Sequence, residues 1–198
     1  LVLINCIPVL ANTIQNTIIG SETVDKTVVE REEYILDSIN SMLEIEGKNA
    51  IDSSDIDYSK MIRRFHFSNL FEGEKLNKNQ MKEYTENQDV VYMLPISCDD
   101  VTALSTLEIR KPLTEEDKKN LSEDDIEFVQ EQVGKWFISV KGIRPGNIDY
   151  KNTVETVLEK NNIENSEVYF VGGICSHISL VAVICSDVPD DTRILVLE

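Results

Sequence analysis

The second half of the chain consists of short apolar segments separated by turn residues, and this pattern restricts the possible folds more than any other feature. Residues 90–96 are apolar throughout, and residues 101–110 alternate between apolar and polar side chains. Alternation with a period of two is typical of β-strands, and the short linker between the two segments is typical of an antiparallel hairpin. Turns are predicted at Gly172–Gly173 and at residues 189–191. The same reasoning predicts further strands at residues 136–143, 168–171, 178–185 and 192–197.

Helical spacing of apolar residues marks the segments around these strands. In residues 23–46, side chains such as Ile35 and Ile39 recur every three to four positions, and Gly47 can end this helix in a left-handed turn. The spacing of Tyr58, Met61, Ile62 and Phe65 predicts a second, short helix. Further helices are predicted at residues 122–134 and 152–161.

Two capping boxes occur between the second and third predicted strands. Thr114 is followed three residues later by Asp117, and Ser122 is followed in the same way by Asp125. In such a box, the hydroxyl and the carboxylate satisfy each other's backbone N–H groups at the start of a helix. The second box opens the helix at residues 122–134, whose Ile126, Val129 and Val133 are predicted to line one face.

The order of these elements predicts an α+β fold. We expect a mostly antiparallel sheet of about six strands with packed helices, preceded by an N-terminal helical segment. Within this organisation, residues 12–88 form a helical region and residues 89–198 form the sheet region. A chain of 198 residues can bury a sizeable core, so we expect the two regions to form one compact domain.

The first eleven residues carry no charge and end in Val9-Leu10-Ala11. Small residues one and three positions before a cleavage point are typical of a secretory signal peptide. We therefore interpret residues 1–11 as the remnant of a signal peptide; an N-terminal strand or the remnant of a membrane anchor are the alternatives. This interpretation predicts a secreted or cell-envelope protein with no membrane span in the mature chain.

The chain is strongly acidic, with 36 acidic residues against 19 basic ones and a net charge of −17. Nucleic acids and anionic membrane surfaces are bound through clustered Lys and Arg, so this charge argues against both. The partner is instead expected to be a protein, a small molecule or a glycan. Residues 60–67, around His66, form one basic and aromatic cluster. This cluster could bind an acidic partner; alternatively, its apolar side chains belong to the core and its basic side chains to a solvated helix face.

Cys175 and His177 form the best candidate for catalysis in the sequence. Two residues apart on a strand, they share a face, and Gly172–Gly173 could donate backbone N–H groups nearby. A buried structural cysteine beside a turn histidine explains the same pattern. No metal or cofactor is predicted, because zinc spacings and phosphate-binding loops are absent and the calcium-like start at Asp55 lacks the required glycine and glutamate.

The two ends of the sheet region contain similar segments. Val91-Tyr92 precedes Cys98 by the same number of residues that separates Val168-Tyr169 from Cys175. This match suggests duplication of an α-β-β unit. Alternatively, any two hairpins with an apolar first strand can have a few identical residues at matching positions. Since Cys98 and Cys175 would lie near turns, we expect them to be more accessible than Cys185.

These observations favour an acidic, exported binding or interaction domain over an enzyme. A cysteine-dependent hydrolase that uses Cys175 and His177 is the first alternative. The second is the extracytoplasmic sensor or pro-domain of a larger assembly, with the N-terminal helix as a connector.

Overall fold

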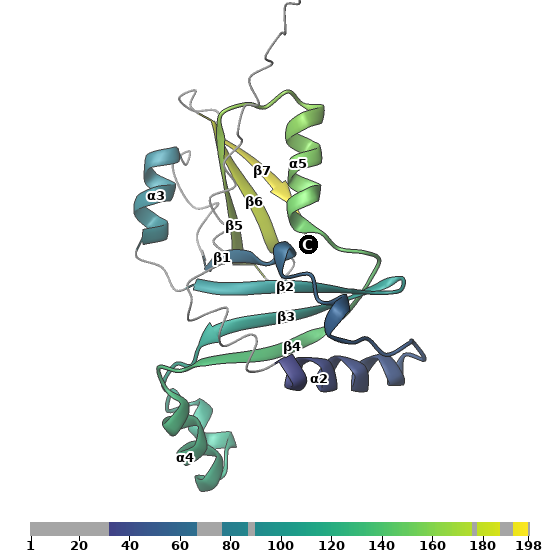
Figure 1. Ribbon diagram of the computed structural model, residues 1–198. Helices are drawn as coiled ribbons and strands as arrows, with labels where there is room; N and C mark the ends of the chain where they lie inside the picture. The colour runs from purple at the N-terminus through teal and green to yellow at the C-terminus, as the bar shows by residue number, and fades with distance from the viewer. Residues whose placement is uncertain (1–31, 67–76, 87–89, 176–177, 187–191, 198) are drawn as a thin grey trace, which may run out of the picture. The chain divides into compact units, whose positions relative to one another are not determined.

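The fold is α+β, as the sequence predicts, with helices and a seven-stranded sheet (Figure 1). The computed structural model describes residues 32–66, 77–86, 90–175, 178–186 and 192–197. The interpreted signal remnant at residues 1–11 lies outside this range. The strands follow the order β4-β3-β2-β1-β5-β6-β7, and the sheet is mixed rather than purely antiparallel. The predicted number of six strands is therefore too low by one.

The additional strand is β1, Ile62–His66, in a segment where the sequence predicts a helix. Tyr58–Lys60 forms only a single 3₁₀ turn, capped by the side chain of Asp57, and the backbone is extended from Met61 onward. Ile62 and Phe65 are buried in the strand. Apolar residues three apart in a short segment fit either conformation, and here pairing with neighbouring strands decides the outcome.

Two compact units divide the chain, and each contains its own antiparallel three-stranded meander. The α2 unit comprises Thr17–Arg64 and Val90–Tyr150. The α5 unit comprises Leu1–Asn16, Phe65–Asp89 and Lys151–Glu198.

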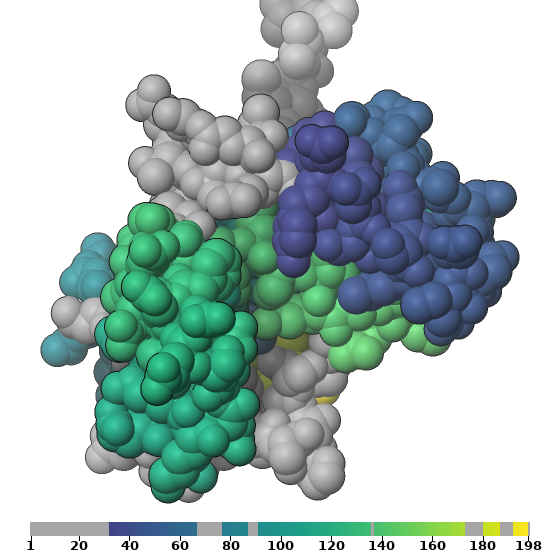
Figure 2. All heavy atoms as spheres, turned by 90° about the horizontal axis from the view of Figure 1, so that it is seen from below, coloured from purple at the N-terminus to yellow at the C-terminus, as the bar shows by residue number. Residues whose placement is uncertain are grey.

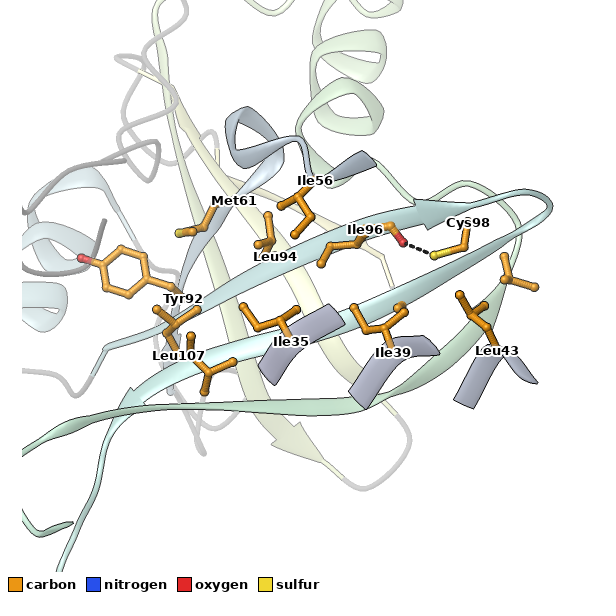
Figure 3. Packing of buried hydrophobic residues seen from close by; sticks show 13 residues of the cluster. Ile35, Ile39, Leu43, Ile56, Met61, Tyr92, Leu94, Ile96, Cys98 and Leu107 are labelled. Atoms are coloured by element: carbon orange, nitrogen blue, oxygen red, sulfur yellow. Dashed lines mark hydrogen bonds between the residues drawn. The ribbon is translucent and has the colours of Figure 1, made fainter. Parts of the chain in front are cut away.

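In the α2 unit, one helix packs on a meander of three strands. The strands are β2 (Val90–Cys98), β3 (Val101–Ile109) and β4 (Trp136–Pro145), and the helix is α2 (Glu32–Ile45). Ile35, Ile39 and Leu43 project from α2 toward apolar side chains of the strands (Figure 3). The predicted hairpin and the predicted buried face of the helix are confirmed. Gly47 ends the helix with a φ of 65°, as predicted.

A β-bulge in β4 adjusts which residues of this strand face the core. Leu104 pairs with Gly142, and the next residue of β3, Ser105, pairs with Val140. Lys141, between Val140 and Gly142, is therefore an extra residue of β4 with no partner of its own in β3. Gly142 has a φ of 132°, a region that residues with a side chain rarely adopt. Because of the bulge, both Val140 and Ile143 pack against the core on the α2 side.

The α5 unit contains two helices and the second meander. The helices are α3 (Lys78–Glu86) and α5 (Tyr150–Lys160), and the strands are β5 (Ser166–Cys175), β6 (Ile178–Ser186) and β7 (Thr192–Val196). Successive residues of β5 and β6 are buried, so both faces of these strands are covered. The predicted turn at Gly172–Gly173 is wrong, since both glycines lie within β5, where the register shifts before Cys175. Among the described residues, no helix combines the length and the apolar character needed to cross a membrane.

The matching sequence segments occupy equivalent places in the two meanders. Cys98 pairs with Val101 at the end of the β2–β3 hairpin, and Cys175 pairs with Ile178 at the end of the β5–β6 hairpin. The connection to the third strand differs between them. In the α5 unit it is residues 187–191, whereas in the α2 unit it is the much longer segment 110–135.

Candidate functional site: the insertion between β3 and β4

Residues 110–135 connect two neighbouring antiparallel strands and contain a helix of their own. Two residues suffice for such a connection, as Asp99-Asp100 between β2 and β3 shows. Segment 110–135 instead forms a 3₁₀ helix, Asp117–Asn120, and then α4, Glu123–Gln132. In Figure 1, α4 lies beyond the ends of β3 and β4. Because this segment far exceeds the length that the connection requires, residues 110–135, here named the insertion, are the candidate site.

The base of the insertion is held in a defined position. Arg110 N–H donates to the carbonyl of Lys135 at 2.9 Å, and Gly134 N–H donates to the carbonyl of Arg110 at 2.9 Å. The guanidinium of Arg110 also stacks on the ring of Phe137, 3.8 Å from its centroid. Gly134 reverses the chain with a φ of 79°. Bonds between the first and last residues of the insertion thus close the end of the β3–β4 ladder.

Local interactions stabilise α4. Of the two predicted capping boxes, the one at Thr114 is complete, and at Ser122 the side chain caps the helix. Ser122 Oγ accepts the N–H of Asp125 at 3.2 Å, and its hydroxyl donates to the carboxylate of the same residue. Before the 3₁₀ helix, the Thr114 N–H donates to the Asp117 carboxylate at 2.9 Å, and the Asp117 N–H donates to Thr114 Oγ1 at 3.2 Å. Acidic residues at 123–125 also interact favourably with the positive end of the helix dipole. The helix therefore forms without being packed into a core.

The side chains of α4 are exposed to an unusual degree. None of its residues is buried, and Ile126 and Val129, on the predicted apolar face, are only half-buried. Phe128 is 61% exposed. Since a helix turns about 100° per residue, Phe128 lies about 200° around the axis from Ile126. Val129 is only about 100° from Phe128, so the exposed ring lies to one side of the half-buried face.

Acidic side chains surround Phe128. Asp124, Asp125 and Glu131 lie three or four positions from it, which places them next to it on the same side of the helix. Figure 2 shows the atoms of the insertion as a lobe of the surface. The sequence analysis missed this site; its signal was an aromatic residue at a polar position of an otherwise acidic helix face.

The structure does not test whether Cys175 and His177, the pair predicted from the sequence, lie close together. Cys175 is the last residue of β5 and pairs with Ile178, but its side chain and the whole of His177 lie outside the described residues. The hydrolase hypothesis therefore stays a prediction.

The expected accessibility of Cys98 is wrong. Cys98 is 3% exposed, and it joins the core beneath α2 (Figure 3). Burial raises the pKa of its thiol and also that of Cys185, which is fully buried. Both are free thiols, and a raised pKa lowers the fraction of reactive thiolate at neutral pH. Position next to a turn did not expose Cys98, because its side chain points to the face of the sheet that the helix covers.

The other polar clusters of the α2 unit hold loops in place. Asp55 accepts the backbone N–H of Asp52 at 2.9 Å in a capped 3₁₀ turn, which explains the calcium-like start of this segment. The described residues include no group of three or more His, Cys, Asp or Glu side chains arranged to hold a metal ion. His66 is exposed at the end of β1.

Two shallow hollows lie along α2, and their polar groups bond to one another. They are lined by residues of α2 and of segment 48–53, including Glu32 and Asn40. The Asn40 amide donates to the carbonyl of Ile51 at 3.0 Å and accepts its N–H at 2.8 Å. Tyr58 donates its hydroxyl to the Glu32 carboxylate at 2.6 Å. These bonds fasten the loop after α2 to the helix.

The bond between Tyr58 and Glu32 predicts a pH-dependent stability. Hydrogen bonds from Ser53 and Tyr58 hold the pKa of Glu32 below its usual range. A lowered pKa in the folded state contributes stability above the unfolded pKa, and this stability is lost as the pH falls through the folded pKa. Tyr58→Phe should therefore lower the free energy of unfolding by about 1 kcal/mol at pH 7, a small value because the pair is partly exposed.

The pH series supplies the check on this prediction. Urea unfolding of wild type and Tyr58→Phe at several pH values should show a difference that shrinks as the pH falls from the unfolded pKa of a glutamate, about 4.3, through the lower folded pKa of Glu32. Tyr34→Phe, on an exposed tyrosine of the same helix, is the matched control and should show no such dependence. A Tyr58→Phe difference that is constant with pH would contradict the role of Glu32.

Neither the family models, nor the curated proteins, nor the solved structures compared with this chain match it.

Proposed function

We propose that this chain is a non-catalytic, exported binding domain that presents the insertion, and α4 in particular, to a protein partner. One observation carries the proposal: a helix held at a closed strand end exposes an aromatic side chain and buries no residue. The uncharged segment 1–11 supports export.

The energetics of α4 favour this role. Burying a phenylalanine side chain in a partner gains about 1.5–3 kcal/mol, and aromatic residues are common among the few that dominate binding energy. Helices that carry such an anchor commonly bind in grooves of other proteins. The backbone bonds of Arg110 with Gly134 and Lys135 hold the base of the insertion in place. The insertion therefore has little conformational freedom left to lose on binding.

Removing the insertion should leave the fold intact. A variant in which residues 111–134 are replaced by Asn-Gly joins Arg110 to Lys135 through a two-residue turn of the kind favoured in hairpins. Its free energy of unfolding in urea should stay within about 1 kcal/mol of wild type, because the removed helix contributes no buried residue.

The same variant tests the function. A partner isolated by cross-linking to the intact protein should bind neither this variant nor Phe128→Ala, and a synthetic peptide of residues 111–134 should compete with the intact protein. A partner that binds the shortened variant as tightly as wild type would contradict the proposal.

A further inference from the structure

We infer that the partner of α4 is a protein with an apolar pocket that receives Phe128 and a rim of Lys and Arg side chains that faces the acidic residues around it. This inference rests on the proposed function and adds the chemistry of the partner.

The centre of the surface is apolar. Phe128 is the most exposed aromatic side chain among the described large hydrophobic residues, at 61%, against 53% for Tyr34 on α2. A phenyl ring has no polar atom, so only an apolar pocket compensates fully for removing it from water. The pocket of the partner must therefore be apolar where the ring enters.

The surroundings of the ring are negatively charged. The helix carries five acidic residues, Glu123, Asp124, Asp125, Glu127 and Glu131, and none of its ten residues is basic. Asp124, Asp125 and Glu131 flank Phe128, as shown above. Complementary charge around an apolar centre raises the rate and the specificity of association, so Lys and Arg are expected at the rim of the partner's pocket.

The charge of the chain opposes other occupants of this surface. A second copy of the protein would bring another net charge of −17 to an acidic helix, and like charges placed together disfavour association. Anionic lipid surfaces are disfavoured for the same reason.

Synthetic amphipathic helices provide a defined probe. A peptide of leucine and lysine, with one apolar face and a lysine rim, offers the inferred chemistry; a peptide with glutamate in place of lysine removes the charge match, and one with serine in place of leucine removes the apolar face. We expect only the leucine–lysine peptide to bind wild type in fluorescence anisotropy. Phe128→Ala should weaken this binding about tenfold or more.

Three variants separate the two parts of the inference. Tyr34→Ala, an exposed aromatic residue on another acidic helix, should leave the affinity unchanged. The double variant Asp124→Asn, Glu131→Gln should bind more weakly and with a smaller dependence on salt. Equal binding of the serine–lysine peptide, or equal affinity of Phe128→Ala, would overturn the inference. Phe128-dependent binding to phosphatidylcholine vesicles would overturn it in favour of a membrane surface.

The result is distinguishable from a failure of the proposed function. If the peptides bind independently of Phe128 while a natural partner still requires the insertion, the inferred chemistry is wrong and the binding role stands. If the natural partner binds the shortened variant, both are wrong.

Discussion

Replacing Phe65 by alanine should lower the free energy of unfolding by about 3–5 kcal/mol. Phe65 is 2% exposed, and its ring lies 6.4 Å from that of Tyr169 on β5 at an angle of 56°. The substitution removes the apolar contacts of a large side chain, the aromatic pair with Tyr169 and the filling of a buried volume. Urea unfolding monitored by circular dichroism measures the loss.

This variant also tests the strand assignment of β1. The next residue, His66, is exposed, so His66→Ala should change the free energy of unfolding by less than about 0.5 kcal/mol. Phe65→Leu keeps most of the apolar volume and should lose less than Phe65→Ala, which preserves the test if the alanine variant does not fold. A loss below about 1 kcal/mol for Phe65→Ala would show that this segment is not part of the core.

Replacing Ile39 by alanine should cost about 2–5 kcal/mol. Ile39 lies in the middle of the buried face of α2, has no exposed surface, and faces the apolar residues of the β2–β3 hairpin (Figure 3). Alanine favours the helix itself slightly, so the measured loss reports packing rather than helix propensity. The cost depends on how far the surrounding side chains can close the cavity.

The matched control for Ile39→Ala lies on the same helix. Ile45, the last residue of α2, is 84% exposed, and Ile45→Ala should change the free energy of unfolding by less than about 0.5 kcal/mol. Similar losses for the two variants would mean that α2 does not pack on the meander through the face described.

Several parts of the fold could be predicted because their signals are local. The buried face of α2 follows from side chains three and four positions apart, and its end follows from Gly47. The β2–β3 hairpin follows from two apolar segments and a short polar linker. The cap of α4 at Ser122 depends only on Asp125, three residues away.

Elsewhere the local signal was ambiguous, and long-range pairing decided the structure. The apolar spacing in residues 58–65 fits a helix and a strand equally, so the placement of β1 in the sheet was not evident. Gly172–Gly173 has the composition of a turn, yet it continues β5 because β6 pairs alongside, and the turn comes later. In both segments strand pairing outweighs weak local preference.

The candidate site shows the same division most clearly. The sequence by itself determined that residues 122–134 form a capped acidic helix, since caps, charges and helix propensity act within one or two turns. Only the tertiary structure decided that this helix buries none of its residues and leaves Phe128 in solvent. Burial of a side chain depends on which distant elements pack against it. The exposure of this helix therefore could not be predicted from its own residue pattern.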